Sequence, residues 1–268
     1  MAENPNGYLF RFFDIPVSTV RGDVEYINVK RYLSGSTDRN GDKSKVFNKL
    51  QSFVRFSKSR ETGEPYQQGE WFVDPRLHPH GRIQYSWTKV LAPFNGKGTP
   101  ESYSRFLHLV DFWLAFGCKG MYRPVTWTSV PTLKKFVNDY MGVDCNSFVG
   151  GFFQVNYPAT GWHTSVDWNK AELKRGPQRQ SIDDVQPLDV LVQYKGKKEK
   201  HVAVIDDIWG KKGSKATAVI SQSAGSAGGL WSGMCTLEIT ASGKAITSNG
   251  YRCDFDEGAF GVIGANSF

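Results

Sequence analysis

The chain has 268 residues, of which 40% are hydrophobic and 14% aromatic, enough for one large domain or for a larger and a smaller one. No apolar stretch approaches the length that a membrane-spanning helix needs, so we expect no transmembrane segment. The formal net charge of +7, from 33 Lys and Arg against 26 Asp and Glu, favours an anionic surface as a partner. An ordinary soluble protein of moderate charge fits this balance equally well.

The N-terminus and the cysteines indicate the compartment. The segment MAENPNGYLFRFFDIP has no basic start, and Arg11 and Asp14 interrupt its apolar run, so we expect no secretory signal peptide. Four cysteines are too few for a disulfide scaffold, and no pair has the spacing of a zinc site. We therefore expect reduced thiols, no metal and no cofactor.

Residues 1–98 are predicted to form an accessory region with strands and a helix. YLFRFF and VEYINVKRYL are typical of strands, with a turn near Gly22 between them. SKVFNKLQSFVRF places its apolar residues on one helical face, whereas residues 60–98 look irregular. We place a domain boundary near residue 98 and assign no role to the region before it.

Residues 99–268 read as helices followed by strands. Thr99, Pro100 and Glu101 are typical of a helix start, and that helix is expected to run to about Phe116. A second helix is expected from about Ser129, with Val130 in its buried stripe. From residue 189 the pattern changes to strands: DVLVQY, KHVAVIDDI, ATAVISQS, CTLEIT and FGVIGA. This order predicts an α+β fold in which helices pack on an antiparallel sheet.

Cys145 lies where a third helix is expected to begin. Asp144 is a good N-cap, which places Cys145 in a first turn whose backbone N–H groups are unpaired and whose macrodipole is positive. Both effects favour thiolate, so we expect the pKa of Cys145 to lie below the free value of about 8.5. The same N–H groups could hold an oxyanion. A single buried Cys is more often an inert small hydrophobe, so a nucleophile also needs a base.

His201 is the base that the strand pattern offers. It opens the strand KHVAVIDDI, and a His at a sheet edge can face a helix start that packs across the sheet. A lone His is usually a surface or capping residue, and only the combination with Cys145 favours catalysis.

Three motifs resemble those of NlpC-type cell-wall peptidases. VDCNSFVGGF is similar to their Asp-Cys-Ser-Gly-Phe-Val signature, QPLDVLVQY to their Pro-Gly-Asp-Leu-Leu-Phe strand, and HVAVIDDI to their His-Val-Ala/Gly-Ile strand. CHAP-type amidases share the same Cys-then-His order. The resemblance covers about residue 129 to the C-terminus and implies a papain-like cysteine hydrolase domain over residues 99–268, of bacterial or phage origin.

The resemblance implies a catalytic pair with a third, orienting residue. Cys145 would attack a carbonyl and His201 would be its base. The strand ATAVISQS supplies three polar candidates, of which Gln222 is favoured because its amide oxygen can accept an imidazole N–H; Ser221 and Ser223 remain alternatives.

Two residues depart from the family pattern. Asn146 replaces the serine that follows the family's cysteine, on the side of the site where Asp144 and Asn146 are expected to bind substrate. Leu188 replaces the glycine of Pro-Gly-Asp, which predicts a different turn into the following strand.

The sequence thus predicts a cysteine peptidase or amidase that acts on peptidoglycan or on another peptide or amide substrate. Two alternatives remain: an acyl- or amide-transferring enzyme of the same fold acting on lipid or protein, and a degenerate member that only binds cell wall or a partner. We expect no nucleic-acid partner. Without a signal peptide, the protein is expected in the cytoplasm, or at the cell wall by a route that uses no such signal, as for a lysin or a toxin.

Overall fold

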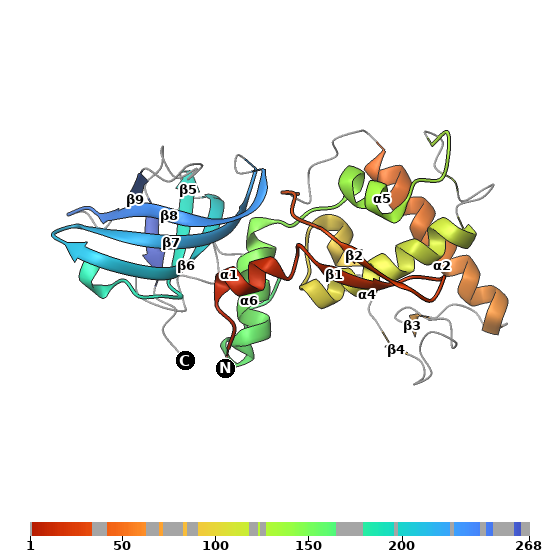
Figure 1. Cartoon of the computed structure of the whole chain (residues 1–268), viewed down its shortest axis with the longest axis horizontal. Coiled ribbons are helices and arrows are strands. Elements are labelled where there is room, and N and C mark those ends of the chain that lie inside the picture. The colour runs from red at the N-terminus through yellow and green to blue at the C-terminus, as the bar shows by residue number, and fades with distance from the viewer. Residues whose placement is uncertain are drawn as a thin grey trace.

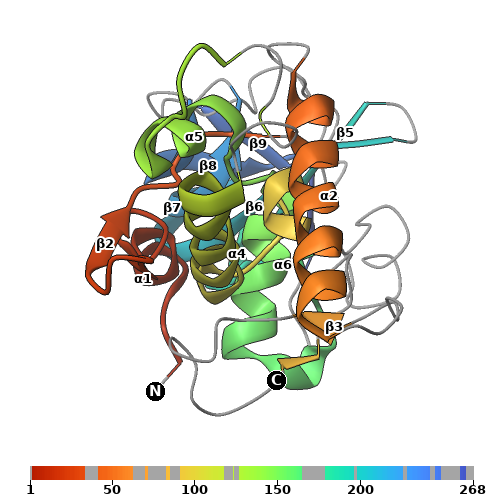
Figure 2. The same ribbon diagram turned by 90° about the vertical axis from the view of Figure 1, so that its right-hand side faces the viewer.

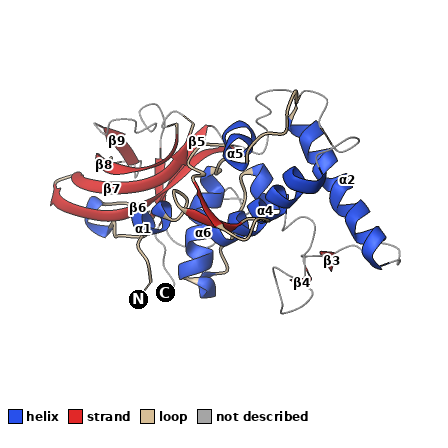
Figure 3. Ribbon diagram, turned by 45° about the vertical axis from the view of Figure 1, so that its right-hand side comes forward, coloured by secondary structure: helices blue, strands red, loops and turns tan. Residues whose placement is uncertain are grey.

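The computed structural model describes residues 2–33, 42–62, 70–71, 83–84, 91–117, 123, 127–164, 179–195, 198–225, 228–241, 245–248 and 260–263. A group of antiparallel strands forms one end of the molecule, and helices form the other (Figures 1 and 3). This arrangement confirms the expected α+β class. No helix of the described ranges is long and apolar enough to cross a membrane.

Six strands form a closed antiparallel barrel in the order β10-β5-β6-β7-β8-β9. Pairing of Phe260 with Ala245 closes it. The sequence predicted five of these strands but not β9. The strand bounds are β5 Val190–Lys195, β6 Lys198–Lys212, β7 Lys215–Ala224, β8 Gly229–Ile239, β9 Ala245–Ser248 and β10 Phe260–Ile263.

Alternate residues of these strands belong to two separate cores, as the two-residue period of a strand requires. Leu191, Ala203 and Ile205 pack with Ile220 and others in a core inside the barrel. Their neighbours, among them Val202 and Val204, pack against the helices instead. Residues 190–192 of β5 and 201–205 of β6 are buried on both faces, which explains the nearly continuous apolar sequence of these segments.

The three helices of the central segment begin at side-chain caps. Thr99 caps α4 (Pro100–Phe112), which continues as a π-helical turn over Trp113–Gly117. Thr132 caps α5 (Leu133–Tyr140), so the expected start near Ser129 was wrong, and Val130 is exposed rather than buried. The third helix is α6 (Cys145–Asn156), which begins where the sequence predicted.

The N-terminal region contains one helix in place of an expected strand. Residues Pro5–Phe10 form α1, capped by Asn4, and residues 11–13 form turns, so the strand prediction for YLFRFF was wrong. The turn that contains Gly22 is present as expected, and β2 (Val24–Ile27) forms the first part of the expected strand VEYINVKRYL, but its partner across the turn is β1 (Ile15–Ser18), which the sequence did not predict. The remaining elements are α2 (Lys43–Thr62), β3 (Glu70–Trp71), β4 (Ile83–Gln84) and the 3₁₀ turn η1 (Ala92–Asn95).

One hydrophobic core joins the N-terminal region to the central helices and to the sheet. Tyr8, Phe12 and Ile15 share this core with residues of α4, α5 and α6 and with Val202. The helix α1 contacts β6, β7, β8 and α6, and Figure 1 shows α1 and α6 side by side between the barrel and the other helices. The boundary expected near residue 98 therefore does not coincide with a break in the core.

Candidate functional site

Cys145 is the first residue of α6, and Asp144 caps that helix. The Asp144 carboxylate accepts hydrogen bonds from the backbone N–H groups of Asn146, at 2.9 Å, and Ser147, at 3.3 Å. Cys145 forms no disulfide bond and is buried, with 5% of its surface exposed. Since Asp144 occupies two N–H groups of the first turn, those two do not serve as oxyanion donors, contrary to the sequence-based expectation.

Asp144 and Asn146, the expected substrate-binding residues, differ in what they contact. The Asp144 carboxylate also forms an ion pair with Lys97, and the same oxygen, Oδ1, makes this contact and accepts from the two backbone N–H groups. The side-chain oxygen of Asn146 lies 3.8 Å from the Cys145 sulfur. Asn146 is therefore placed next to the thiol, and a role in substrate binding stays a prediction.

His201 and Gln222 are joined by a buried hydrogen bond. His201 Nε2 lies 2.7 Å from Gln222 Oε1. The side chains are 7% and 0% exposed. Because Ala203 pairs with Gln222 across β6 and β7, His201 lies diagonally across from Gln222 on the same face of the sheet. The expected contact between His201 and a polar residue of ATAVISQS is confirmed, and Gln222 makes it.

This hydrogen bond determines how the imidazole is used. An amide oxygen can only accept, so Nε2 carries the proton. In the neutral ring, Nδ1 then holds the lone pair. An imidazole held in this tautomer can take a proton through Nδ1 and share the resulting charge with the Gln222 oxygen.

The two alternative serines make other contacts. Ser221 Oγ lies 3.0 Å from Ser232 Oγ on β8. Ser223 Oγ donates to the backbone oxygen of Val143 at 2.7 Å. The Ser223 bond fixes the end of β7 to the turn that leads into α6. The residue next to Gln222 in sequence is therefore bonded two residues before Cys145.

The packing of α6 agrees with this connection. The helix contacts both β6 and β7, and the ribbon seen from the helical end shows α6 in front of those strands (Figure 2). The turn before Cys145 thus meets the end of β7 through Ser223, whereas His201 and Gln222 share the face of Ala203 and Ile220, whose side chains pack inside the barrel.

Residues 30–33 of the N-terminal region form one side of the turn before Cys145. The backbone oxygen of Arg31 accepts from Val143 N at 2.7 Å, and Leu33 N donates to Val143 O at 3.2 Å. On the other side, Lys30 O accepts from Leu230 N at 2.7 Å. The accessory region therefore supports the turn before Cys145 directly. These contacts could not be predicted, because they join segments more than 100 residues apart.

Tyr103 supports the same turn from α4. Its phenol donates to the backbone oxygen of Gly142 at 2.5 Å. Burial raises the pKa of Tyr103 well above its usual value, and the nearby Asp144 carboxylate raises it further. The phenol therefore stays protonated and remains a donor at any physiological pH.

The turn into β5 keeps a conformation that suits glycine, although Leu188 occupies it. Leu188 has a φ of 74°, in the left-handed region. The next residue, Asp189, is buried and forms two hydrogen bonds with Arg179, at 2.9 and 3.1 Å. It also accepts from Gln186 N at 2.9 Å. Leu188 therefore adopts a backbone conformation that glycine favours, and a turn different from that of the family stays a prediction.

The remaining cysteines are not placed at comparable positions. Cys235 forms no disulfide bond and is buried in the core inside the barrel. Cys118 and Cys253 lie outside the described residues. Within the described ranges, no cluster of three or more His, Cys, Asp or Glu side chains could hold a metal ion.

Comparison of the chain with protein-family models, with curated proteins and with solved structures returned no match.

Proposed function

We propose that the protein is a cysteine-dependent hydrolase that cleaves peptide or amide bonds through Cys145, with His201 as base and Gln222 as orienting residue. The observation that carries the proposal is the buried 2.7 Å bond between His201 Nε2 and Gln222 Oε1, in two strands that pack against α6, whose first residue is Cys145. A buried, hydrogen-bonded imidazole and a thiol at a helix start are the parts that thiol catalysis needs.

In the proposed reaction, His201 Nδ1 takes the proton of the Cys145 thiol, and the thiolate attacks the carbonyl carbon of the substrate. The imidazolium then gives that proton to the leaving amine as the C–N bond breaks, which leaves a thioester on Cys145. A water molecule, deprotonated by His201, attacks the thioester, and the acid product leaves as the thiol is restored.

Gln222 acts on orientation in this scheme. Its neutral amide keeps the ring in the tautomer whose Nδ1 can accept a proton, but it adds no negative charge, unlike a carboxylate in the same place. A neutral orienting residue is sufficient when the thiolate itself balances the imidazolium. The third position of this site is therefore compatible with catalysis.

Peptidoglycan is the substrate that we propose. Its support is the resemblance of VDCNSFVGGF, QPLDVLVQY and HVAVIDDI to cell-wall peptidase motifs. The net charge of +7 is compatible with attraction to an anionic cell-wall polymer.

Digestion of purified peptidoglycan, with mass analysis of the released fragments, tests both proposals. We expect the native chain to release fragments with a new amine and a new carboxylate, Cys145→Ala to release none, and Cys235→Ala to release the same fragments as the native chain. Equal release by native chain and Cys145→Ala would contradict the thiol mechanism. No release by the native chain, together with a reactive Cys145, would contradict the choice of peptidoglycan.

A further inference from the structure

The negative charge of Asp144 lies next to the proposed Cys145 thiolate. Its carboxylate lies at the positive end of α6, where it caps Asn146 and Ser147. A carboxylate directly before a nucleophilic cysteine disfavours the thiolate, because a nearby like charge penalises the charged form. It also offsets the positive macrodipole that would otherwise favour the thiolate.

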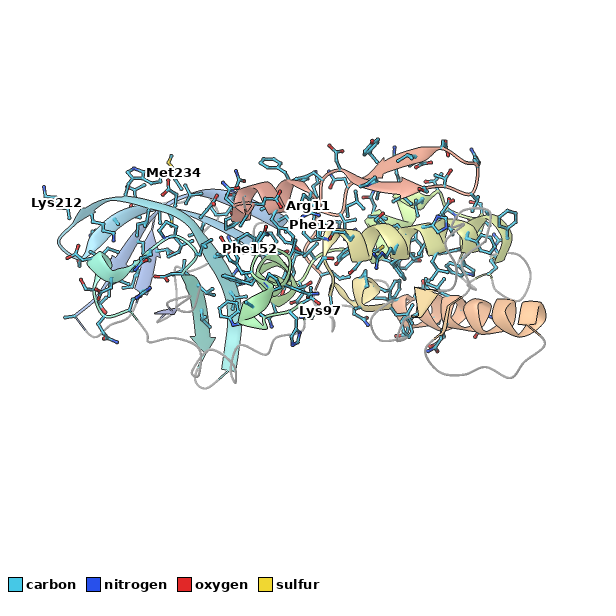
Figure 4. The ribbon with its side chains drawn as sticks, turned by 90° about the horizontal axis from the view of Figure 1, so that it is seen from below. Arg11, Phe12, Lys97, Phe152, Lys212 and Met234 are labelled. Carbon is cyan, nitrogen blue, oxygen red and sulfur yellow. The ribbon has the colours of Figure 1, made fainter. Side chains whose placement is uncertain are left out.

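Lys97 supplies a positive charge that pairs with the Asp144 carboxylate. Its Nζ lies 2.6 Å from Asp144 Oδ1, and the two side chains are only 25% and 11% exposed. Partial burial limits screening of this pair by salt. Figure 4 shows Lys97 near α6 in the middle of the molecule, whereas Lys212 lies at the far tip of the barrel.

The loop that carries Lys97 is bound to the start of α6 on both sides of the lysine. Gly96 O accepts from Asp144 N at 3.0 Å, and Gly98 N donates to Ser147 Oγ at 2.8 Å. Gly96 has a φ of 77°, and a Cβ there would lie 2.3 Å from Leu33 O. The lysine is therefore delivered by a closely packed loop and not by a free surface segment.

We propose that Lys97 is a positioning residue of the thiol site, which cancels the charge of Asp144 so that this carboxylate can cap α6 without opposing the Cys145 thiolate. The inference rests on the proposed function, since it concerns the same thiol. It assigns a role to a segment of the region before residue 98 and to a residue that lies 48 positions before the cysteine in sequence.

The pH dependence of iodoacetamide alkylation at Cys145, followed by peptide mass analysis, tests the proposal. Lys97→Met should raise the midpoint of the profile by about one pH unit and slow alkylation about tenfold at pH values below the midpoint. The plateau at high pH should not change. Lys97→Arg should restore the native profile, and Lys212→Met should leave it unaltered. Where Lys97→Met does not fold, Lys97→Gln removes the same positive charge.

A double-variant cycle separates charge cancellation from a merely structural role. Asp144→Asn keeps an N-cap and removes the negative charge, so its midpoint should equal or lie below the native one. Adding Lys97→Met to Asp144→Asn should then shift the midpoint much less than in the native chain. An equal shift in both backgrounds, or no shift in either, would overturn the inference. A native midpoint no lower than about 8.5 would instead overturn the proposed function.

Discussion

The backbone conformation of Leu188 could not be predicted from its residue type. Its φ of 74° lies in the left-handed region, which costs a residue with a Cβ about 1–2 kcal/mol. The turn it occupies leads into β5 and positions Asp189, which is bound to Arg179. Leu in place of Gly gives no sign of this turn in the sequence. The conformation is imposed by surrounding hydrogen bonds, such as that from Leu188 N to Ile205 O.

Leu188→Gly should be more stable than Leu188→Ala by about 1 kcal/mol, because only glycine adopts this φ without cost. Both variants lose the partly buried Leu side chain, so their comparison isolates the backbone. At an ordinary position the order is reversed. The measurement is the free energy of unfolding in urea. An Ala variant as stable as the Gly variant would show that the angle is not under strain.

The pKa of His201 should depend on the side chain at position 222. Gln222→Glu places a carboxylate against Nε2, which favours imidazolium, so the pKa of His201 should rise by about one unit or more. Gln222→Leu removes the acceptor and should lower this pKa. The measurement is an NMR titration of the imidazole ring, assigned by comparison with His201→Ala. Identical titration in all three chains would contradict the hydrogen bond.

The sequence predicted part of this site for chemical reasons. An amide can accept from an imidazole and hold it, which favoured Gln222 over Ser221 and Ser223. The final choice depends on strand register, since neighbours alternate between faces. Lys97 could not be predicted, because nothing in the local pattern links it to Asp144, 47 residues later.

At the scale of elements, two of the capping side chains were recognised in the sequence. Thr99 and Asp144 were recognised as caps, and α4 and α6 begin after them. The six residues of α1 were not recognised as a helix, because they make fewer than two turns. Over so short a segment, the apolar pattern of a helix cannot be told from that of a strand. The start of α5 was placed too early, since Thr132 and not Ser129 is the cap.

Gly150 lets α6 approach a neighbouring segment closely. An added Cβ would lie 2.2 Å from the backbone oxygen of His163, which cannot swing aside as a side chain could. Gly150→Ala should therefore destabilise the protein by about 1–3 kcal/mol, although Ala is normally better than Gly in a helix by about 1 kcal/mol.

The control for this prediction is Val155→Ala, in the same helix at a residue that is 37% exposed. It should change the free energy of unfolding by no more than about 0.5 kcal/mol. Urea unfolding of both variants gives the comparison. A Gly150→Ala chain at least as stable as the native one would show that α6 does not pack closely against His163.

At the scale of the whole molecule, the main result is one core that runs from the N-terminal region to the barrel. The sequence could not show this, because the contacts join Tyr8 and Phe12 to residues far along the chain. Closure of the barrel was equally hidden, since it depends on the pairing of Phe260 with Ala245. Apolar patterns predict which segments form strands, but not which of them are neighbours.

Two nearby phenylalanines test this shared core. Phe12 is fully buried and Phe10 is 59% exposed. Figure 4 labels Phe12 between the barrel and the helices. Phe12→Ala should cost about 3–5 kcal/mol of unfolding free energy in a single transition that includes the barrel, whereas Phe10→Ala should cost much less. Two separate transitions, with only one affected by Phe12→Ala, would show that the N-terminal region folds by itself.

The most direct test of the thiol site compares alkylation of each cysteine in the native and the urea-unfolded chain at about pH 6. An unfolded cysteine, with a pKa of about 8.5, is almost entirely protonated there and reacts slowly. We predict that Cys145 reacts faster in the native chain than in the unfolded one, that His201→Ala removes this difference, and that Cys235, buried in the barrel, reacts more slowly when native. A native Cys145 that is protected in the same way as Cys235 would contradict the account.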